Sequence, residues 1–253
     1  LNTLGIAAYK ISYEFGLTEV EQATRLGVDL RLNSPVTGDG VAKLLTEFDA
    51  VFLGVGLGRT LPLGIEGESL PGVWEALDFI FQTHTKPFTE CEVGRRVLVI
   101  GAGNTAVDVA TAAFRLGADE VTMAYRRGEA AMPAFAYEVG MAKADGIRFE
   151  FFAQPKRMIA GPDGRVCGVE FVRTRGDGGR TGSLTAVPGS EFTLPADMVV
   201  KALGQEPLLQ LLKALPGLKL DGTKVAVDPA TGATSVPRLF AGGDCVRGGA
   251  EIV

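Results

Sequence analysis

The stretch VLVIGAGNTAVDVATAAFRLG at residues 97–117 decides the fold. It joins an apolar run at 97–100 to a glycine turn at 101–106, and then to a helical pattern that ends at Gly117. A second apolar run, EVTMAYRR at 120–127, follows directly. A strand, a tight glycine turn, a helix and a second strand within about 30 residues predict a right-handed βαβ unit.

The glycine turn has the pattern GxGxxA, which is typical of dinucleotide-binding sites. Gly101 permits the tight turn, Gly103 lets a pyrophosphate approach the backbone, and the small Ala106 lets the helix pack on the strand. The start of the helix offers free N–H groups and the positive end of its dipole to phosphates. The alternative is a turn with a purely structural role. We predict that a dinucleotide binds at Gly101, Ala102, Gly103, Asn104 and Thr105.

The end of the second strand indicates which dinucleotide binds. In an NAD site, an Asp or Glu at this point binds the ribose hydroxyls. Here the strand ends in Arg126 and Arg127, and two guanidinium groups bind a 2′-phosphate through charge-assisted hydrogen bonds. The sequence therefore favours NADP(H) over NAD(H). The alternative is that one arginine is a solvated charge at the strand end, paired with Glu129.

The composition of the 253 residues is that of a globular protein, with 46% hydrophobic and 22% charged residues. The net charge is −5, so neither nucleic acid nor an anionic membrane is an expected partner. No apolar run reaches the roughly 18 residues of a membrane span. Cys91, Cys167 and Cys245 form no CxxC pair, which argues against a dithiol centre or a zinc knuckle and fits the reducing cytoplasm. The single histidine, His84, is expected to be solvated, and no metal site is predicted.

The rest of the chain alternates helical and apolar patterns. Further helices are predicted at 17–26, 40–47, 74–82 and 134–145. Further strands are predicted at 28–32, 51–56, 147–152, 156–160, 166–173, 199–204, 224–228 and 238–241. The glycine-terminated strands VFLGVG at 51–56 and VVKALG at 199–204 look like equivalent parts of two related domains. A domain boundary is expected near 84–94.

Several ordered motifs carry a resemblance to known flavoproteins. LFAGGDC at 239–245, ahead of GGAEIV, resembles the C-terminal flavin motif of flavoproteins with two dinucleotide domains, and FDAVFLGVG at 48–56 and ADMVVKALGQEP at 196–207 resemble their domain crossovers. With GIAAYK at 5–10 and YRRGEAAMPA at 125–134, the chain resembles the glutamate synthase small-subunit family over essentially its whole length. That family includes the flavin module of dihydropyrimidine dehydrogenase, and a bacterial pyrimidine-reducing subunit is the expected nearest member.

The resemblance implies that electrons pass from NAD(P)H to FAD, and then to iron–sulfur clusters or a partner subunit. It implies that Arg126 and Arg127 hold the NADP phosphate, and that the nicotinamide cleft is lined by Ala202, Leu203 and Gly204. Hydride transfer between two cofactors needs no protein nucleophile, so no catalytic side chain is expected. Cys245 has no partner thiol and is expected to pack. The residues that the resemblance places at FAD are Lys10, Val36, Gly243, Asp244 and Cys245.

We expect an α/β fold with two Rossmann-like lobes. The pyridine-nucleotide lobe at 94–230 is inserted between two pieces of an FAD lobe, 1–93 and 231–253. The family's first FAD glycine fingerprint and its iron–sulfur cysteines are absent from this sequence, so the FAD lobe is expected to be incomplete and the chain a fragment. Two other functions remain open: an NADPH:ferredoxin reductase of the same architecture, and a non-catalytic NADPH-binding subunit or fragment.

Overall fold

The computed structural model describes residues 4–176, 179 and 181–249. The chain forms two compact units. The first comprises Leu1–Val28 and Pro62–Leu203, and the second comprises Asp29–Leu61 and Gly204–Val253. Each unit is therefore assembled from two separate stretches of sequence.

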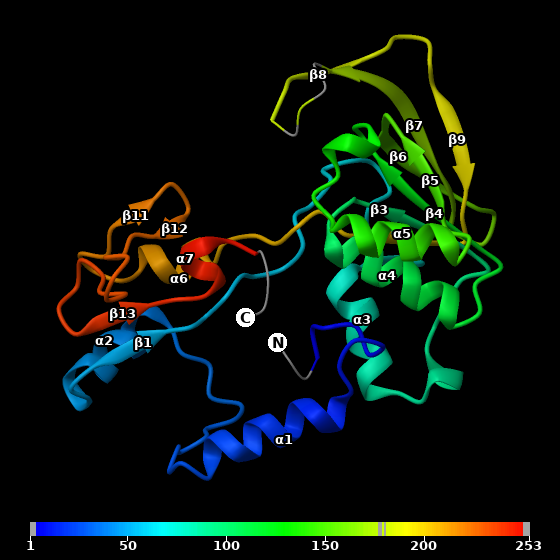
Figure 1. The fold of residues 1–253 in the computed structure, drawn as a ribbon. Helices are drawn as coiled ribbons and strands as arrows, with labels where there is room; N and C mark the ends of the chain where they lie inside the picture. The colour runs from blue at the N-terminus through cyan, green and yellow to red at the C-terminus, as the bar shows by residue number, and fades with distance from the viewer. Residues whose placement is uncertain (1–3, 177–178, 180, 250–253) are drawn as a thin grey trace. The chain divides into compact units, whose positions relative to one another are not determined.

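The first unit is built on a five-stranded parallel sheet in the order β2–β10–β3–β4–β5. Figure 1 labels three of these strands, β3, β4 and β5. Its strands are β2 (Val73–Glu75), β10 (Met198–Lys201), β3 (Arg96–Ile100), β4 (Glu120–Tyr125) and β5 (Arg148–Phe151). The helices are α1 (Tyr13–Thr24), α3 (Ala76–Thr85), α4 (Asn104–Arg115) and α5 (Ala136–Ala144), with short 3₁₀ turns at Phe88–Glu90 and Glu129–Ala131. Because the strands are parallel, their carboxyl ends share one edge, where open α/β sheets bind ligands.

Strand β3 shows how the sheet is covered on both faces. Val97 and Val99 belong to the core that the sheet forms with α3, α4 and α5. Leu98 and Ile100 point to the other face, into a core shared with residues of a second sheet such as Phe171. Successive side chains of a strand alternate between faces, so a strand buried on both sides is apolar throughout. This explains why the VLVI run is continuous rather than alternating.

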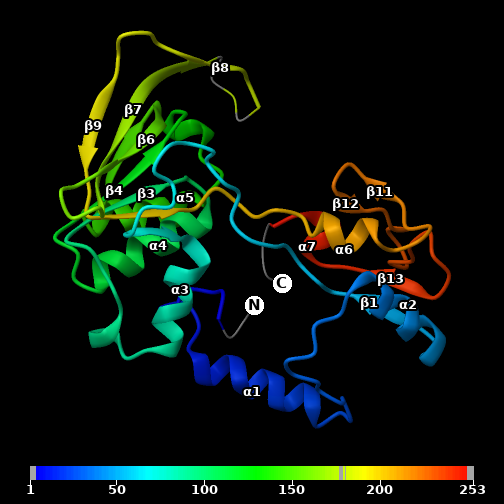
Figure 2. The same ribbon diagram turned by 180° about the vertical axis from the view of Figure 1, so that it is seen from behind.

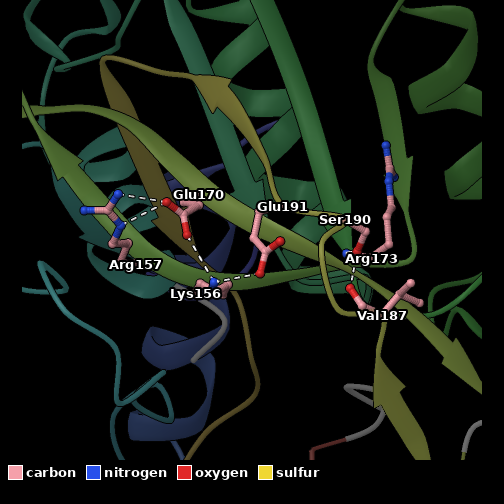
Figure 3. Close-up of polar contacts among 7 residues, drawn as sticks. All are labelled: Lys156, Arg157, Glu170, Arg173, Val187, Ser190 and Glu191. Carbon is pink, nitrogen blue, oxygen red and sulfur yellow. Dashed lines mark hydrogen bonds and ion pairs between the residues drawn. The ribbon is translucent and has the colours of Figure 1, made fainter.

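The second sheet of this unit is antiparallel and consists of β6 (Ala153–Ala160), β7 (Val166–Gly176), β8 (Leu184–Ala186) and β9 (Phe192–Pro195). Exposed side chains on it form ion pairs (Figure 3). Lys156 Nζ lies 3.3 Å from Glu170 and 3.1 Å from Glu191, and Arg157 lies 2.8 Å from Glu170. Exposed pairs of this kind add little stability, so the sheet is held mainly by its apolar face.

The second unit is smaller (Figure 2). Its elements are α2 (Gly38–Glu47), β1 (Val51–Leu53), α6 (Leu209–Lys213), β11 (Leu220–Asp221), β12 (Lys224–Val225), β13 (Leu239–Ala241) and α7 (Asp244–Arg247). Strand β1 pairs in parallel with β13, and β11 pairs antiparallel with β12. Its core gathers Val41, Leu53, Leu212 and Leu239, all nearly inaccessible to solvent.

One expected strand is missing from the described part of the chain. Residues 28–32 form no strand, and Val28, Leu30 and Leu32 are more than half exposed. The sequence has the alternation of a strand, but a strand also needs a neighbour for its backbone hydrogen bonds. None of the described residues supplies that neighbour, so the prediction for 28–32 is wrong for this structure.

The boundaries of the compact units differ from the expected lobes at 1–93, 94–230 and 231–253. Strand β2 pairs with β10, more than 120 residues later in the sequence, and this pairing draws the segment from Pro62 into the first unit. At the other end, the chain leaves this unit after Leu203, directly beyond β10. Within the described ranges, no helix is long and apolar enough to cross a lipid bilayer.

Candidate functional site

The turn between β3 and α4 brings two predicted segments of the site together. Gly101 has a φ of +145°, which side chains with a Cβ rarely adopt. A Cβ atom here would lie 2.2 Å from the carbonyl oxygen of Ala202, which directly follows β10. Glycine is therefore required at 101, and its close approach places the glycine turn beside Ala202, the first residue of the predicted nicotinamide segment.

The first turn of α4 is open to a ligand. Gly103 is the N-cap residue, so no cap side chain accepts a hydrogen bond from the first amides. Among the described residues, a Cβ atom at Gly103 would meet only Pro133 Cγ, at 3.9 Å. The protein itself does not require glycine at this position, whereas a phosphate that approaches the backbone does. Thr105 is exposed beside these amides, while Ala106 is completely buried against the sheet.

The segment after β4 is fastened to the glycine turn. The amide of Ala134 donates to the Ala102 carbonyl at 3.2 Å, and the amide of Phe135 donates to Asn104 Oδ1 at 3.0 Å. The side-chain oxygen of Asn104 is thus used inside the protein. Asn104 can therefore serve a phosphate with its backbone amide, and its side chain fixes the shape of the site.

Arg126 and Arg127 follow β4 at the carboxyl edge of the sheet. Arg126 is exposed, and its guanidinium has no ion-pair partner in the described part of the chain. If Arg126 were only a solvated charge at the strand end, Glu129 would be its expected partner. Glu129 Oε1 instead lies 2.5 Å from Lys143 Nζ. Arg127 is half-buried and donates through Nη1 to the Gly179 carbonyl at 3.0 Å. Arg126 is therefore the freer of the two cations to bind an anion.

A cavity of about 410 Å³ lies beside the arginine pair. Arg127 lines it together with the side chains of Phe151, Phe152 and Leu184. A largely apolar cavity of this size with a cation at its wall is suited to a heterocyclic base that carries a phosphate nearby. Sequence reasoning missed this cavity because its walls come from β5, β8 and the segment after β4, which only the fold brings together.

A buried ion cluster that sequence reasoning also missed lies at the end of β10. Lys201 is 6% exposed, and its Nζ lies 2.7 Å from Glu68 and 2.8 Å from Glu75. Glu68 also accepts the amides of Leu63 and Gly64, at 2.7 and 2.8 Å. Burial alone would raise the pKa of Glu68, but these hydrogen bonds outweigh it and hold the pKa below its ordinary value.

Glu68→Gln is expected to lower the free energy of unfolding by roughly 2–3 kcal/mol at pH 7, because it removes a charged acceptor from Lys201. The lowered pKa of Glu68 means that its contribution is present above the unfolded-state pKa and is lost as pH falls through the lower folded-state value. The difference from wild type should therefore shrink below about pH 4.5. Urea unfolding at pH 3.5 to 7 measures this difference in unfolding free energy. Glu66→Gln, at an exposed glutamate, is the control. A difference between Glu68→Gln and wild type that does not change with pH would contradict the expectation.

The predicted flavin contact Lys10 belongs to a second ion cluster, in which Lys10 is exposed and its two carboxylate partners are buried. Its Nζ lies 2.7 Å from Asp108 on α4 and 2.6 Å from Glu138 on α5, and Tyr9 donates its hydroxyl to Asp108 at 2.6 Å. Burial alone would lower the pKa of Lys10, but the two carboxylates outweigh it and raise that pKa. Burial and the hydrogen bond to Asp108 raise the pKa of Tyr9. The contact of Lys10 with FAD stays a prediction.

His84 helps to hold the same N-terminal segment. Its ring nitrogen Nε2 is hydrogen-bonded to the carbonyl oxygen of Ile6. The expectation that His84 is solvated is therefore wrong, because α3 presents this side chain to a segment 78 residues away in sequence. Among the described residues, no group of three or more His, Cys, Asp or Glu side chains is placed to hold a metal ion.

The remaining predicted flavin residues lie in the second unit. Gly243 has a φ of +73°, and Asp244 begins the four-residue helix α7. Cys245 is 3% exposed, and its thiol donates to the carbonyls of Gly242 and Leu53 at 3.2 and 3.5 Å. Val36 is 48% exposed ahead of α2. The structure thus places Cys245 in the core, as its expected packing role requires, and the flavin contacts themselves stay predictions.

The model of the pyridine nucleotide-disulphide oxidoreductase family matches residues 12–253. The chain belongs to this family. Strand β3, the Gly101 turn and α4 all lie inside the matched range, so the predicted α/β, Rossmann-like fold is confirmed.

Two relatives in sequence and one solved structure are informative. The small chain of glutamate synthase (NADPH) from Escherichia coli K12 is 38% identical over 271 residues, which cover 100% of this chain and 57% of the relative. The beta subunit of NADP(+)-dependent formate dehydrogenase from Moorella thermoacetica is 38% identical over 261 residues, which cover 99% of this chain and 36% of that subunit. The solved structure is FprA from Mycobacterium tuberculosis in complex with NADPH. It matches with a TM-score of 0.65 at 21% identity, and the match covers 87% of this chain and 63% of FprA.

The predicted resemblance to the glutamate synthase small-subunit family is confirmed by the first of these matches. The chain spans 57% of that relative's length and 36% of the formate dehydrogenase subunit. The narrower expectation of a pyrimidine-reducing subunit stays a prediction.

Proposed function

We propose that this chain is the NADPH-binding part of a flavin-dependent oxidoreductase that passes electrons from NADPH through FAD to a partner subunit or to iron–sulfur clusters. One observation carries the proposal. The uncapped start of α4, the close Gly101 turn and Arg126, which has no ion-pair partner among the described residues, lie along one edge of one sheet. Backbone amides and a free guanidinium are the groups that a phosphorylated dinucleotide needs.

Each segment of this edge has a separate role in the proposal. The amides of Gly103, Asn104 and Thr105 bind the pyrophosphate, since nothing from their own helix caps them. Arg126 and Arg127 bind the 2′-phosphate, beside a cavity that takes the adenosine. The nicotinamide lies against Ala202, Leu203 and Gly204, where the chain leaves β10.

The second unit fits one part of a flavin site. Asp244 is half-buried, and within the described ranges no donor is bonded to its carboxylate, which leaves it available to hydroxyl groups of a ribityl chain. When bound, FAD would supply a carrier that accepts two electrons and releases them one at a time. All three cysteines of the chain are free thiols, so this chain offers FAD no disulfide as an acceptor.

The proposed partner follows from the relatives. Glutamate synthase small chain and formate dehydrogenase subunit beta are named as components of larger enzymes. By this likeness, the chain delivers electrons to another subunit in the cytoplasm, where unpaired thiols stay reduced. An NADPH:ferredoxin reductase and a non-catalytic NADPH-binding subunit are the alternatives, and they differ in electron acceptor and in turnover.

Anaerobic titration of the full-length protein, purified with its flavin, tests the proposal. NADPH is expected to bleach the flavin absorbance near 450 nm at lower concentration than NADH. Nucleotide binding without bleaching would favour the non-catalytic alternative. If neither coenzyme binds or bleaches the flavin, the proposal is wrong.

A further inference from the structure

The backbone of the arginine pair is held by residues far away in sequence. Strand β4 ends at Tyr125, so Arg126 and Arg127 lie beyond it. The Arg126 carbonyl accepts the hydroxyl of Thr174 at 2.5 Å, and the Arg127 carbonyl accepts the amide of Phe152 at 3.2 Å. Both carbonyls are thus fixed, while the Arg126 guanidinium forms no ion pair with any residue that the structure describes.

Phe152 is the bend between β5 and β6. Its φ is +57°, which residues with a Cβ rarely adopt and keep only where their surroundings enforce it. Its carbonyl accepts the amide of Thr174 at 3.0 Å, and its ring lies so close to Gly128 that a Cβ there would be 2.7 Å from it. Phe152 therefore links Thr174 to the arginine segment: its carbonyl bonds to Thr174 and its amide bonds to Arg127.

Strand β7, which carries Thr174, is itself firmly placed. The neighbouring Arg173 donates its amide to Ser190 Oγ at 3.0 Å, and Ser190 donates to the Val187 carbonyl (Figure 3). The Arg173 guanidinium donates to Glu150 and to the Phe151 carbonyl, on β5, and lies 3.9 Å from the centre of the Phe192 ring. Thr174 is 4% exposed, and these contacts of its neighbour hold the backbone of β7 in place beside it.

We propose that Thr174 is a positioning residue that sets the preference of this protein for a 2′-phosphorylated nucleotide. By fixing the Arg126 carbonyl, its hydroxyl fixes the direction in which the arginine side chain leaves the backbone, and a pre-positioned guanidinium loses less conformational freedom on binding. The inference rests on the proposed NADPH site. If Thr174 only supports the fold, substituting it weakens the binding of all adenosine nucleotides alike. If Thr174 positions Arg126, the substitution weakens the binding only of nucleotides that carry a 2′-phosphate.

Thr174→Val tests this, because valine keeps the shape and removes the hydroxyl. Calorimetric titration of the 253-residue chain compares 2′,5′-ADP with 5′-AMP, which differ in the 2′-phosphate. The wild type is expected to bind 2′,5′-ADP more tightly, and Thr174→Val to reduce this ratio at least about fivefold through weaker 2′,5′-ADP binding alone. The matched control is Thr83→Val, which removes another buried hydroxyl, bonded to the Ile80 carbonyl in α3, and should leave the ratio unchanged.

The outcomes separate the inference from the proposed function. A wild type that does not distinguish the two probes contradicts the NADPH site itself. A discriminating wild type with an unchanged ratio in Thr174→Val, or with equal losses for both probes, overturns the role of Thr174. Thr174→Ser keeps the hydroxyl and must retain the wild-type ratio. If thermal melting shows that Thr174→Val is unfolded, Thr174→Ala replaces it with the same expected result.

Discussion

Replacing Gly101 by alanine is expected to abolish NADP⁺ binding and to lower the free energy of unfolding by roughly 2–5 kcal/mol. The added Cβ would lie 2.2 Å from the Ala202 carbonyl oxygen and 2.9 Å from its carbonyl carbon, and both are backbone atoms. The backbone at 101 also has a φ of +145°, which alanine disfavours. Either β10 or the turn must move, and both form the proposed site. Calorimetry and urea unfolding measure the two effects.

Gly140→Ala is the matched control. Gly140 lies in α5, is exposed, and has no atom of the described residues within 4 Å of an added Cβ. Alanine favours a helix over glycine by up to about 1 kcal/mol, so this variant should be slightly more stable and bind NADP⁺ normally. A Gly101→Ala protein that binds NADP⁺ as tightly as wild type would contradict the account of the turn.

Arg126→Gln is expected to weaken NADP⁺ binding by about 10- to 100-fold and to leave NAD⁺ binding within about twofold. The range corresponds to a hydrogen bond to a charged group, worth roughly 1.5–3 kcal/mol. Arg126 is chosen because its guanidinium is exposed and unpaired among the described residues, whereas Arg127 already donates to Gly179. Calorimetric titration with both nucleotides measures the change.

Arg95→Gln controls for the loss of positive charge. Arg95 is exposed in the same unit and lies 2.7 Å from Asp119. Since exposed pairs contribute little, this variant should bind both nucleotides like wild type. Equal weakening of NADP⁺ and NAD⁺ by Arg126→Gln would mean that Arg126 supports the fold and does not recognise the 2′-phosphate.

The centre of the fold could be predicted because its signals are local. The VLVI run is apolar throughout since β3 is covered on both faces, and the required glycine at 101 is adjacent to it. The position of Arg126 at the end of the next strand likewise predicts its role from a local signal. The structure adds what the sequence did not predict: β3 pairs in parallel with β10, which brings the Gly101 turn beside Ala202.

The rest of the site depends on contacts between distant residues. Thr174 bonds to Arg126 across 48 residues, and Lys10 reaches Glu138 across 128. Neither pair has a pattern in the sequence, because a threonine in a strand or a glutamate on a helix is usually solvated. Such long-range contacts, whether a hydrogen bond or an ion pair, are a property of the assembled sheet and helices.

A crystal structure of the chain grown with NADP⁺ tests the central claim most directly. We predict that the pyrophosphate lies within hydrogen-bonding distance of the amides of Gly103, Asn104 and Thr105, and that the 2′-phosphate contacts the Arg126 guanidinium. NADP⁺ bound at another edge of the sheet, or a side chain occupying the start of α4 in its place, would contradict the account.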